Sequence, residues 1–597
     1  MRPQALRLGL LGALALAVTG HASPTYGSNS TRGCKAIPGD SAWPSQKQWN
    51  ALNETVGGRL VATQLLGSMC HKESRPKLLS IEGYNDTACE DLKGDYDLLE
   101  THVAWPGEVV NPYWQGDTCS PWTSPDQECL IGQAASYAIN ISMEGDVVGD
   151  IQAGMKFAKK HNIRLIVKNT GHDFLGRSTG TGSLMLWTHN LQGINHTDSY
   201  KSANYSGPAI TLKSGTQGFQ AYQYAHEAGY RIVGGECPTV GIAGGYTTGG
   251  GHSILSSKYG MAADSVLEWE VVTPQGEHVF ARPNGKHSDL YWALSGGGGS
   301  TWGVTLGFTT KLYKDDIVSA GNFSFSANGV PYQNYLDAVA ATYAFMPGFS
   351  DAGNSILWVQ YNTSFETYSI TMPDKTSDEM TETWKPLLQQ LENLNINYTF
   401  ETRTDPNYYV HVDRDQGPLP YGSQEQATTA LLNSRIMPIS LISDPSKPET
   451  KAFHLAVQNM TTMNDARYIW GCVSLGTNKW KDTYNSVFPA WRDSMAHCVL
   501  QAAWNREIPH QEMVDIKKYT TSVVVPYMEE YTPGGHVYIN EIDPLYQGDW
   551  KKYGYGSNYN RLLSIKKKYD PDNLFWGHFS VGGDKFTTDS AGRVCKA

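Results

Sequence analysis

Apolar residues recur with two different spacings along this chain, and each spacing predicts a type of element. In DVVGDIQAGMKFAKKHN (146–162) they recur three or four residues apart from Val148 to Ala158, which predicts an amphipathic helix. The run IRLIV (163–167) follows directly and is continuously apolar, as is typical of a buried strand. A helix that leads into a strand therefore opens the regularly patterned part of the sequence.

The same two patterns predict further elements. Helices are expected at 216–229, where Gly229 would end the helix, at 377–394, and at 557–575, where Asp570-Pro571 would end it. Strands are expected at 230–235, 355–362 and twice within 266–281, around a Pro-Gln-Gly turn. Residues 291–313 read as a helix end, a glycine loop and a strand. Strands and helices mixed in this way predict an α+β fold.

The composition changes along the chain and suggests five segments. A signal peptide is expected at 1–22, because Arg2 and Arg7 precede an apolar run and small residues follow, with cleavage after Ala22. Residues 23–125 are rich in Pro, Gly, Cys and aromatics and are expected to be irregular and pinned by disulfides. Regular patterning then predicts one α+β domain at 126–313, a second at 314–535 and a C-terminal segment at 536–597.

Bulk properties restrict the class of protein. The 597 residues are 40% hydrophobic and 18% charged, which fits a globular protein with sizeable cores. The apolar run near the N-terminus is too short to cross a membrane, and no other run approaches 18 residues. The net charge of −11 argues against nucleic acid and anionic membranes as partners. We expect a secreted monomer.

Glycosylation sequons support export. Ten occur, each predicted to lie in a surface loop, at Asn29, Asn53, Asn85, Asn140, Asn195, Asn204, Asn322, Asn362, Asn397 and Asn459.

The chain has nine cysteines, so at least one must stay without a disulfide partner even if all the others pair in an oxidising compartment. Cys119 with Cys129, and Cys472 with Cys498, could close loops. Cys237 stands apart within a glycine-rich segment. It could be a buried thiol, a disulfide partner or a reactive thiol.

Three glycine-rich segments stand out: NTGHDFLGRSTGTG (169–182), ECPTVGIAGGYTTGGGHS (236–253) and SGGGGSTWG (295–303). Taken singly, each could be turn geometry. Three in one domain favour a long, phosphate-bearing ligand, because glycine lets backbone N–H groups approach phosphates. The dinucleotide-binding and P-loop fingerprints are missing, as are zinc-protease and nucleophile-elbow motifs. No metal site is expected.

These segments in this order, followed by YNRLLSIKKKYDPDNLF, resemble the berberine-bridge-enzyme-like flavoproteins. That group belongs to the vanillyl-alcohol-oxidase superfamily with its PCMH-type FAD domain, and the fungal secreted, isoamyl-alcohol-oxidase-like branch is the most similar. The resemblance is strong over 130–313, good over the last 60 residues and only in outline between them. It implies a PCMH-type FAD-binding domain at 126–313 and a substrate domain with an antiparallel sheet covered by helices.

The resemblance implies FAD held by two covalent bonds. His172, in the Gly-His-Asp turn, would bond through a ring nitrogen to the flavin 8α carbon, and Cys237 would bond to flavin C6. Imidazole and thiolate are suitable nucleophiles for these two carbons. The unpaired cysteine would then have a role, which leaves eight cysteines for four disulfides.

The remaining cofactor residues follow by analogy. The pyrophosphate would lie on the backbone of Asn169, Thr170, Gly171, His172, Asp173 and Gly176, and the ring and ribityl chain on Gly244, Gly245, Gly249 and Gly250. Two departures are visible. The run from Gly241 to Gly245 is one residue longer than in many relatives, and Tyr246 replaces a histidine that is common there.

The resemblance further implies hydride transfer from a substrate to flavin N5. The small Val240, three residues after Cys237, resembles oxidase members and favours reoxidation by O2 to give H2O2. Substrate class stays open among alcohols, sugars and aromatic alcohols. A secondary-metabolite dehydrogenase or cyclase, a flavin-carrying protein without turnover, and a hydrolase are the alternatives.

Alcohol oxidation needs a base within hydrogen-bond reach. HVYINEIDPLY (536–546) resembles a strand beside the flavin in relatives, and Tyr538, Glu541 and Asp543 are the candidates. Glu541 stands where relatives have tyrosine or histidine. Alternatively it points to solvent, because successive strand residues face opposite ways.

Overall fold

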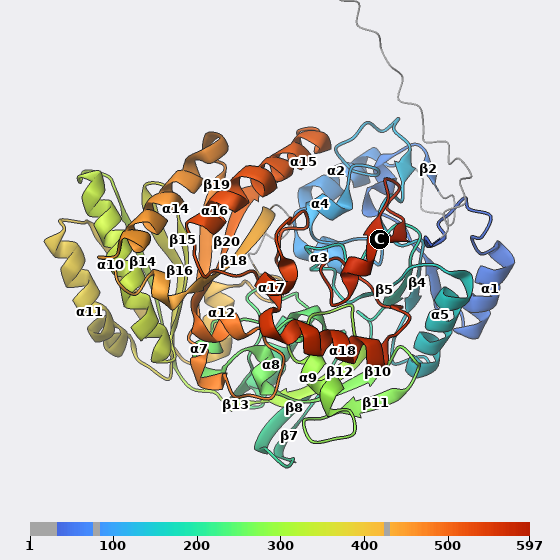
Figure 1. Cartoon of the computed structure of the whole chain (residues 1–597), viewed down its shortest axis with the longest axis horizontal. Helices are drawn as coiled ribbons and strands as arrows, with labels where there is room; N and C mark the ends of the chain where they lie inside the picture. Colours follow the sequence, from blue (N-terminus) through green and yellow to red (C-terminus); the bar gives the residue numbers. More distant parts are fainter. Residues whose placement is uncertain (1–32, 76–83, 423–429) are drawn as a thin grey trace, which may run out of the picture.

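The computed structural model describes residues 33–75, 84–422 and 430–597, and shows two halves built on different sheets (Figure 1). The predicted signal peptide and the Asn29 sequon lie outside the described residues. One half carries a four-stranded and a five-stranded sheet, and the other a seven-stranded antiparallel sheet. The prediction of an α+β fold with an antiparallel sheet covered by helices is confirmed. The five segment boundaries stay a prediction.

The four-stranded sheet has the order β1-β4-β6-β5. Its strands are β1 (Leu60–Ala62), β4 (Tyr137–Asn140), β6 (Leu184–Trp187) and β5 (Leu165–Lys168), and only β1 runs antiparallel to its neighbour. Helix α5 (Val147–His161) buries its predicted apolar face, and the Asp146 side chain caps its first turn. Asn162, in the left-handed conformation, ends it. The predicted helix and strand at 146–167 are confirmed.

The five-stranded antiparallel sheet has the order β11-β10-β12-β8-β7. Its strands are β7 (Ile194–Lys201), β8 (Ser206–Lys213), β10 (Val266–Val272), β11 (His278–Ala281) and β12 (Val304–Lys311). Strands β10 and β11 pair around the predicted turn. Helices α6 (Gly218–Glu227) and α9 (Ser288–Leu294) were also predicted. The strand expected at 230–235 is only β9 (Tyr230–Arg231), because Ile232 and Val233 are buried in the core without strand pairing and Gly235 lines a cavity.

The seven-stranded sheet has the order β17-β14-β16-β15-β19-β20-β18. It comprises β14 (Val318–Ser326), β15 (Ser355–Gln360), β16 (Ser364–Pro373), β17 (Tyr398–Asp405), β18 (Ala430–Pro438), β19 (Tyr468–Ser474) and β20 (Ser494–Ala503). Helices α10 (Tyr332–Asp351), α11 (Ser377–Asn393) and α14 (Pro448–Ala466) cover its outer face (Figure 1). Buried aromatic side chains, among them Trp358, Trp384 and Trp470, fill the layer between them. The opposite face of the sheet is directed at the first half.

The C-terminal residues return to the half with the glycine loops. Helix α18 (Tyr559–Tyr569), ending before Pro571 as predicted, lies against α9 with the Arg561 guanidinium 3.9 Å from the centre of the Trp292 ring. Phe575 forms a β-bridge to Leu165. Other elements of the C-terminal region are α15 (His510–Tyr519), α16 (Val525–Glu530), α17 (Trp550–Gly554), β21 (Phe586–Thr588) and β22 (Val594–Lys596).

The segment before residue 126 is more regular than predicted. It contains α1 (Gln46–Thr55), α2 (Asp86–Asp95), α3 (Leu99–Val103) and α4 (Pro112–Gln115), and β1 joins the four-stranded sheet. The prediction of an irregular segment is wrong because Trp49 and Leu52 of α1 belong to the same core as α5. Strands β2 (Ser74–Arg75) and β3 (Cys129–Leu130) pair, as do β9 and β13 (Tyr313–Lys314).

All nine cysteines lie in the described part of the chain. The two expected pairs, Cys119–Cys129 and Cys472–Cys498, are present, and Cys34–Cys595 and Cys70–Cys89 complete the set. Cys237 is free. The count that predicted one unpaired thiol is confirmed.

Six of the nine described sequon asparagines are exposed and three are partly buried. The expectation of loops is wrong for several of them, because Asn195 lies in β7, Asn322 in β14 and Asn459 in α14. Within the described residues, no helix combines the length and apolar character needed to span a bilayer.

Candidate active site

A cavity of about 420 Å³ lies between the glycine loops and the seven-stranded sheet. All three glycine-rich segments contribute to its lining, together with β15, β19, β20 and a turn near residue 540. The predicted site residues that line it are Asn169, Thr170, Gly171, His172, Asp173, Cys237, Val240, Gly244, Gly245, Tyr246, Tyr538 and Glu541. Gly176, Gly249, Gly250 and Asp543 are not among the lining residues.

The first loop begins where β5 ends. Gly171 has a φ of +87°, which a glycine adopts without strain, and the chain turns there to present His172 to the cavity. His172 Nε2 lies 2.8 Å from Thr239 Oγ1, so this ring nitrogen is engaged. Burial lowers the pKa of His172 to about 4. The imidazole is therefore neutral, as a nucleophile must be.

Asp173 shapes this loop rather than facing a charged partner. Its carboxylate accepts hydrogen bonds from the backbone N–H of Leu175 (2.9 Å) and of Ser178 (2.6 Å). Protein packing requires a glycine at position 176, because a Cβ there would lie 2.7 Å from the Trp114 ring. The loop is thus held rigidly on its protein side while its other side borders the cavity.

Cys237 lines the same cavity as His172, although the two lie in different loops with 64 residues of sequence between them. Burial, together with the nearby carboxylates of Glu236 and Glu541, raises the pKa of its thiol to about 12. The thiol is therefore protonated at neutral pH, and it could react as a thiolate only after a base had removed its proton.

The longer glycine run folds into a short kinked turn, η2 (Ile242–Tyr246), in which Ala243 and Gly244 have non-helical backbone angles. The hydroxyl of Tyr246 donates to the carbonyl of His252 at 2.7 Å. Tyr246 therefore positions the backbone at His252.

Three observations indicate that the cavity wall could hold a flavin dinucleotide. A Cβ on Gly245 would meet no protein atom within 4 Å, so protein packing does not explain this glycine and a ligand would. Among the described residues, Asn169 Oδ1 and Ser214 Oγ are buried without hydrogen-bond partners. Arg177 Nη2 is likewise buried and unpartnered, and this guanidinium can receive a pyrophosphate.

The third glycine loop closes on the second one. A Cβ on Gly299 would lie 3.4 Å from the Cα of Gly245. The Trp302 indole N–H donates to the carbonyl of Gly298 at 3.0 Å and holds the loop. Three loops far apart in sequence thus border one elongated space, as expected for a long ligand.

The segment 536–546 is a turn, and the expectation of a strand is wrong. The backbone N–H of Glu541 donates to the carbonyl of Tyr538 at 3.0 Å, which bends the chain and turns both side chains to the cavity. Asp543 points elsewhere: it pairs with Lys517 (2.9 Å) and accepts from the Thr521 hydroxyl (2.6 Å). Asp543 therefore has a structural position and is separated from the cavity lining.

Two further residues of this region have structural contacts. The Asn540 amide donates to the carbonyl of Gly245 and to the Tyr538 hydroxyl, both at 2.9 Å. It joins the turn to the second glycine loop, where a Cβ on Gly249 would strike this amide at 2.2 Å. Tyr559 lies outside the cavity lining and accepts from the backbone N–H of Gly582.

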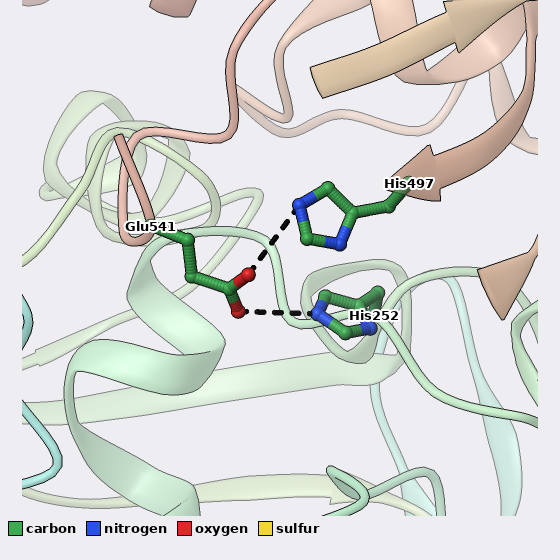
Figure 2. Close-up of side chains that lie close together, drawn as sticks. All are labelled: His252, His497 and Glu541. Atoms are coloured by element: carbon green, nitrogen blue, oxygen red, sulfur yellow. Dashed lines mark hydrogen bonds and ion pairs between the residues drawn. The ribbon is translucent and has the colours of Figure 1, made fainter. Parts of the chain in front are cut away.

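Two histidines that sequence analysis missed flank Glu541 (Figure 2). His252 Nε2 lies 3.4 Å from Glu541 Oε1, and His497 Nε2, on β20, lies 3.4 Å from Glu541 Oε2. The second nitrogen of His252, Nδ1, lies 3.5 Å from Glu236 Oε1. Because 289 residues separate His252 from Glu541, no sequence spacing could have indicated the cluster.

The cluster has an uneven charge distribution. Burial lowers the pKa of His252, but Glu236 and Glu541 outweigh this effect and raise it to about 10. Burial lowers the pKa of His497 to about 4. Burial acts to raise the pKa of Glu541, yet the two histidines lower it on balance. Glu541 is therefore ionised and a weaker base than an isolated buried carboxylate.

Tyr538 completes this wall of the cavity. Its ring packs edge-on against the rings of His252 and His497, with centroids 5.5 and 5.4 Å apart. Burial raises the pKa of its phenol, so the hydroxyl stays protonated and can donate a hydrogen bond.

Comparison with known families agrees with this geometry. A family model described as FAD binding domain matches residues 146–282, and one described as berberine and berberine like matches residues 537–582. These segments carry the first two glycine loops and the Tyr538–Glu541 turn.

Similarity to individual proteins extends over nearly the whole chain. A VAO-type flavoprotein oxidase from Thermothelomyces thermophilus is 43% identical, covering 98% of this chain and 99% of the relative. A bifunctional decalin synthase from Penicillium decumbens is 42% identical over 96% of this chain and 98% of its own length. The middle region, where the sequence suggested resemblance only in outline, is therefore included.

Solved structures show the same fold. The crystal structure of a VAO-type flavoprotein from Myceliophthora thermophila C1 has a TM-score of 0.89 at 43% identity and covers 94% of this chain and 100% of that one. Berberine bridge enzyme from Eschscholzia californica has a TM-score of 0.65 at 17% identity, covering 89% of this chain and 98% of its own. The second likeness concerns the fold alone.

Proposed function

The chain belongs to the VAO-type, berberine-bridge-like FAD-linked oxidoreductases, and from this premise we propose that it is a secreted oxidase whose FAD is bound through two covalent bonds. When bound, FAD supplies hydride acceptance from an alcohol-type substrate and passage of the electrons to O2, which yields H2O2.

The observation that carries the proposal is the shared position of His172 and Cys237. Both line one cavity, and Cys237 is the free cysteine among nine. With Nε2 of His172 engaged by Thr239, Nδ1 is the nitrogen left to bond the flavin 8α carbon. Cys237 would bond C6. The buried Arg177 and the backbone around Gly171 would hold the pyrophosphate.

The opposite wall would receive the substrate. We infer that the Tyr538 hydroxyl donates to a substrate oxygen, while the ionised Glu541 or the neutral His497 accepts the hydroxyl proton and the protonated His252 stabilises the negative charge that is left. Apolar side chains from β15 and β20, including Leu357 and Val499, also line the space and would exclude water from the substrate carbon.

Val240 supports oxygen as the electron acceptor. This small side chain lines the cavity three residues after Cys237, on the glycine-loop side. A branched C3 side chain leaves room for O2 beside the cofactor, where a larger one would not.

Disulfides and glycosylation sequons support export. Four disulfides require an oxidising compartment, and six described sequon asparagines are exposed. A covalently held cofactor suits an exported enzyme, because FAD lost outside the cell could not be replaced.

One alternative has a specific observation in its favour. A relative 42% identical over nearly its full length bears the name bifunctional decalin synthase, so a secondary-metabolite dehydrogenase or cyclase is the second candidate. Leu357, Val359, Val473 and Val499 of the seven-stranded sheet give the cavity an apolar side, which would accommodate a bulky carbon skeleton.

Covalent attachment is tested by acid precipitation of the purified protein, followed by mass spectrometry of its peptides. A yellow pellet and flavin-modified peptides at His172 and Cys237 are expected. A colourless pellet with both peptides unmodified would refute the bicovalent assignment.

The acceptor is tested by photoreducing the flavin without oxygen and then mixing with aerated buffer in a stopped-flow instrument. An oxidase should reoxidise within seconds and release H2O2. Reoxidation over hours would favour the dehydrogenase or cyclase. A peroxide screen over alcohols, sugars and aromatic alcohols then identifies the substrate class.

A further inference from the structure

The cluster around Glu541 has the composition of a metal site. Two imidazoles and one carboxylate present their donor atoms to one another, and these atoms all lie within 4.8 Å (Figure 2). His252 and His497 are 12% and 4% exposed at their side chains, and Glu541 is 18% exposed, so water competes little for the donors. An N2O donor set of this kind is used for divalent first-row metals.

The spacing of the donors suits a metal better than direct hydrogen bonds. Both Nε2–Oε distances are 3.4 Å, long for a hydrogen bond between imidazole and carboxylate. Two ligands at about 2.0–2.1 Å from a tetrahedral Zn²⁺ lie about 3.4 Å apart. Each imidazole–carboxylate separation therefore matches that of two neighbouring ligands of one ion, and one donor atom from each of the three residues lies within 4.8 Å of the others.

A second carboxylate orients one of the histidines. Glu236 Oε1 lies 3.5 Å from His252 Nδ1, on the side of the ring opposite Glu541. A carboxylate behind a ligating histidine selects the tautomer whose other nitrogen is free for metal, and makes that nitrogen more basic. Ser434 Oγ, 3.2 Å from His497 Nε2, is the contact that a metal would displace.

We propose that His252, His497 and Glu541 bind a divalent first-row transition metal such as Zn²⁺, with the cavity side of the ion open to an oxygen donor of the substrate. Three protein ligands and one open position distinguish catalytic from structural zinc sites. All three ligands line the cavity, so the open position faces the space in which the substrate would lie. Metal binding is independent of the proposed oxidase, and only the substrate role rests on that function.

The first experiment uses the untagged full-length flavoprotein. After dialysis against a chelator and desalting, Zn²⁺ is titrated by calorimetry and bound metal is counted by elemental mass spectrometry. We expect one tightly bound Zn²⁺ per chain. Co²⁺ in its place should give ligand-field absorption at wavelengths longer than those of the flavin, which reports on N and O ligands directly.

Variants then locate the ion. His252→Gln, His497→Gln and Glu541→Gln should each weaken Zn²⁺ binding by more than about 100-fold, and Glu236→Gln by about 10- to 100-fold, as a partner of a ligand does. The matched control is His536→Gln, because His536 lies in the same C-terminal segment but outside the cavity lining. Its affinity for Zn²⁺ should equal that of the wild type.

Stoichiometric binding lost in the three ligand variants and kept in the control supports the site. The proposal is overturned if the wild type binds no Zn²⁺ above the level of His252→Gln, or if the ligand variants bind as well as the control. Flavin absorbance and melting temperature show whether each variant is folded. Failure of the peroxide screen would leave the metal result intact, so the two proposals are refuted separately.

Discussion

The two walls of the cavity are built on different physical principles. The wall that we propose for the cofactor, here called the cofactor wall, is formed by residues 169–178, 235–250 and 298–303 and is rich in glycine, with His172 and Cys237 as the proposed attachment residues. The substrate wall, formed by His252, His497, Tyr538 and Glu541, consists of polar side chains delivered by segments far apart in sequence.

This difference has chemical consequences. A neutral His172 and a protonated Cys237 leave the cofactor wall without charged reactive groups, whereas the substrate wall holds an ionised carboxylate between two imidazoles. A glycine-rich wall whose backbone N–H groups are accessible suits a cofactor that stays bound. A wall of polar side chains suits a substrate that has to be recognised and then released as product.

The largest expected effect concerns the cofactor wall. Changing both His172 and Cys237 to alanine should release all flavin on acid precipitation, because no covalent bond remains. Each single change should leave one bond and a yellow pellet. Flavin absorbance of the pellet and supernatant measures the outcome, and a yellow pellet from the double variant would break the assignment of this wall.

On the substrate wall, Glu541→Gln should lower turnover by about 10²- to 10⁴-fold, the usual contribution of a group that handles a proton or charge in the reaction. The flavin should stay covalently bound, which separates the two walls. Glu530→Gln, an exposed carboxylate of α16, is the control and should leave turnover unchanged. Equal turnover in both variants would contradict a role for Glu541.

Two neighbouring glycines offer a sharper comparison. Gly249→Ala should lower the free energy of unfolding by about 1–3 kcal/mol, because the new methyl group overlaps the Asn540 amide. Gly245→Ala meets no protein atom and should instead reduce the flavin content of the purified protein. Denaturant unfolding and flavin-to-protein ratios check both, and the reverse pattern would remove the argument that Gly245 borders the cofactor.

Oxygen access is a smaller effect on the same wall. Val240→Leu should slow reoxidation of the reduced flavin at least about tenfold, which corresponds to about 1.4 kcal/mol in the barrier, because the larger side chain fills space at the cavity. Val240→Ala is the matched control and should reoxidise at least as fast as the wild type. Stopped-flow absorbance decides, and no change in the leucine variant would show that oxygen enters elsewhere.

The smallest expected effect is on the orientation of His172. Thr239→Val removes the hydroxyl 2.8 Å from His172 Nε2 and should cost about 1 kcal/mol of unfolding free energy, the worth of one hydrogen bond. The fraction of flavin bonded at His172, measured by peptide mass spectrometry, should fall while the Cys237 bond persists. An unchanged fraction would mean that packing alone orients the ring.

Long, strongly periodic segments were predicted well from the sequence. Helix α5 followed by β5 was predicted because its apolar spacing repeats over four turns, and α11 and α18 for the same reason. The strand expected at 230–235 was too long because the apolar residues Ile232 and Val233, which are buried in the core outside any sheet, have the same local pattern as residues of a buried strand. Residues 536–546 were taken for a strand because they resemble a strand beside the flavin in related proteins, and the bend between Tyr538 and Glu541 was not foreseen from that resemblance.

The sequence by itself indicated which glycine loops would border the cavity and that His172 and Cys237 would lie in them, because glycine turns and the residues within them are local features that short motifs encode. It also determined the class of fold and the single unpaired thiol. Only the tertiary structure decided the substrate wall. His252, His497 and Glu541 meet because β20, a glycine loop and a C-terminal turn converge on one cavity, and contacts between such distant segments leave no periodic or spacing signal in the chain.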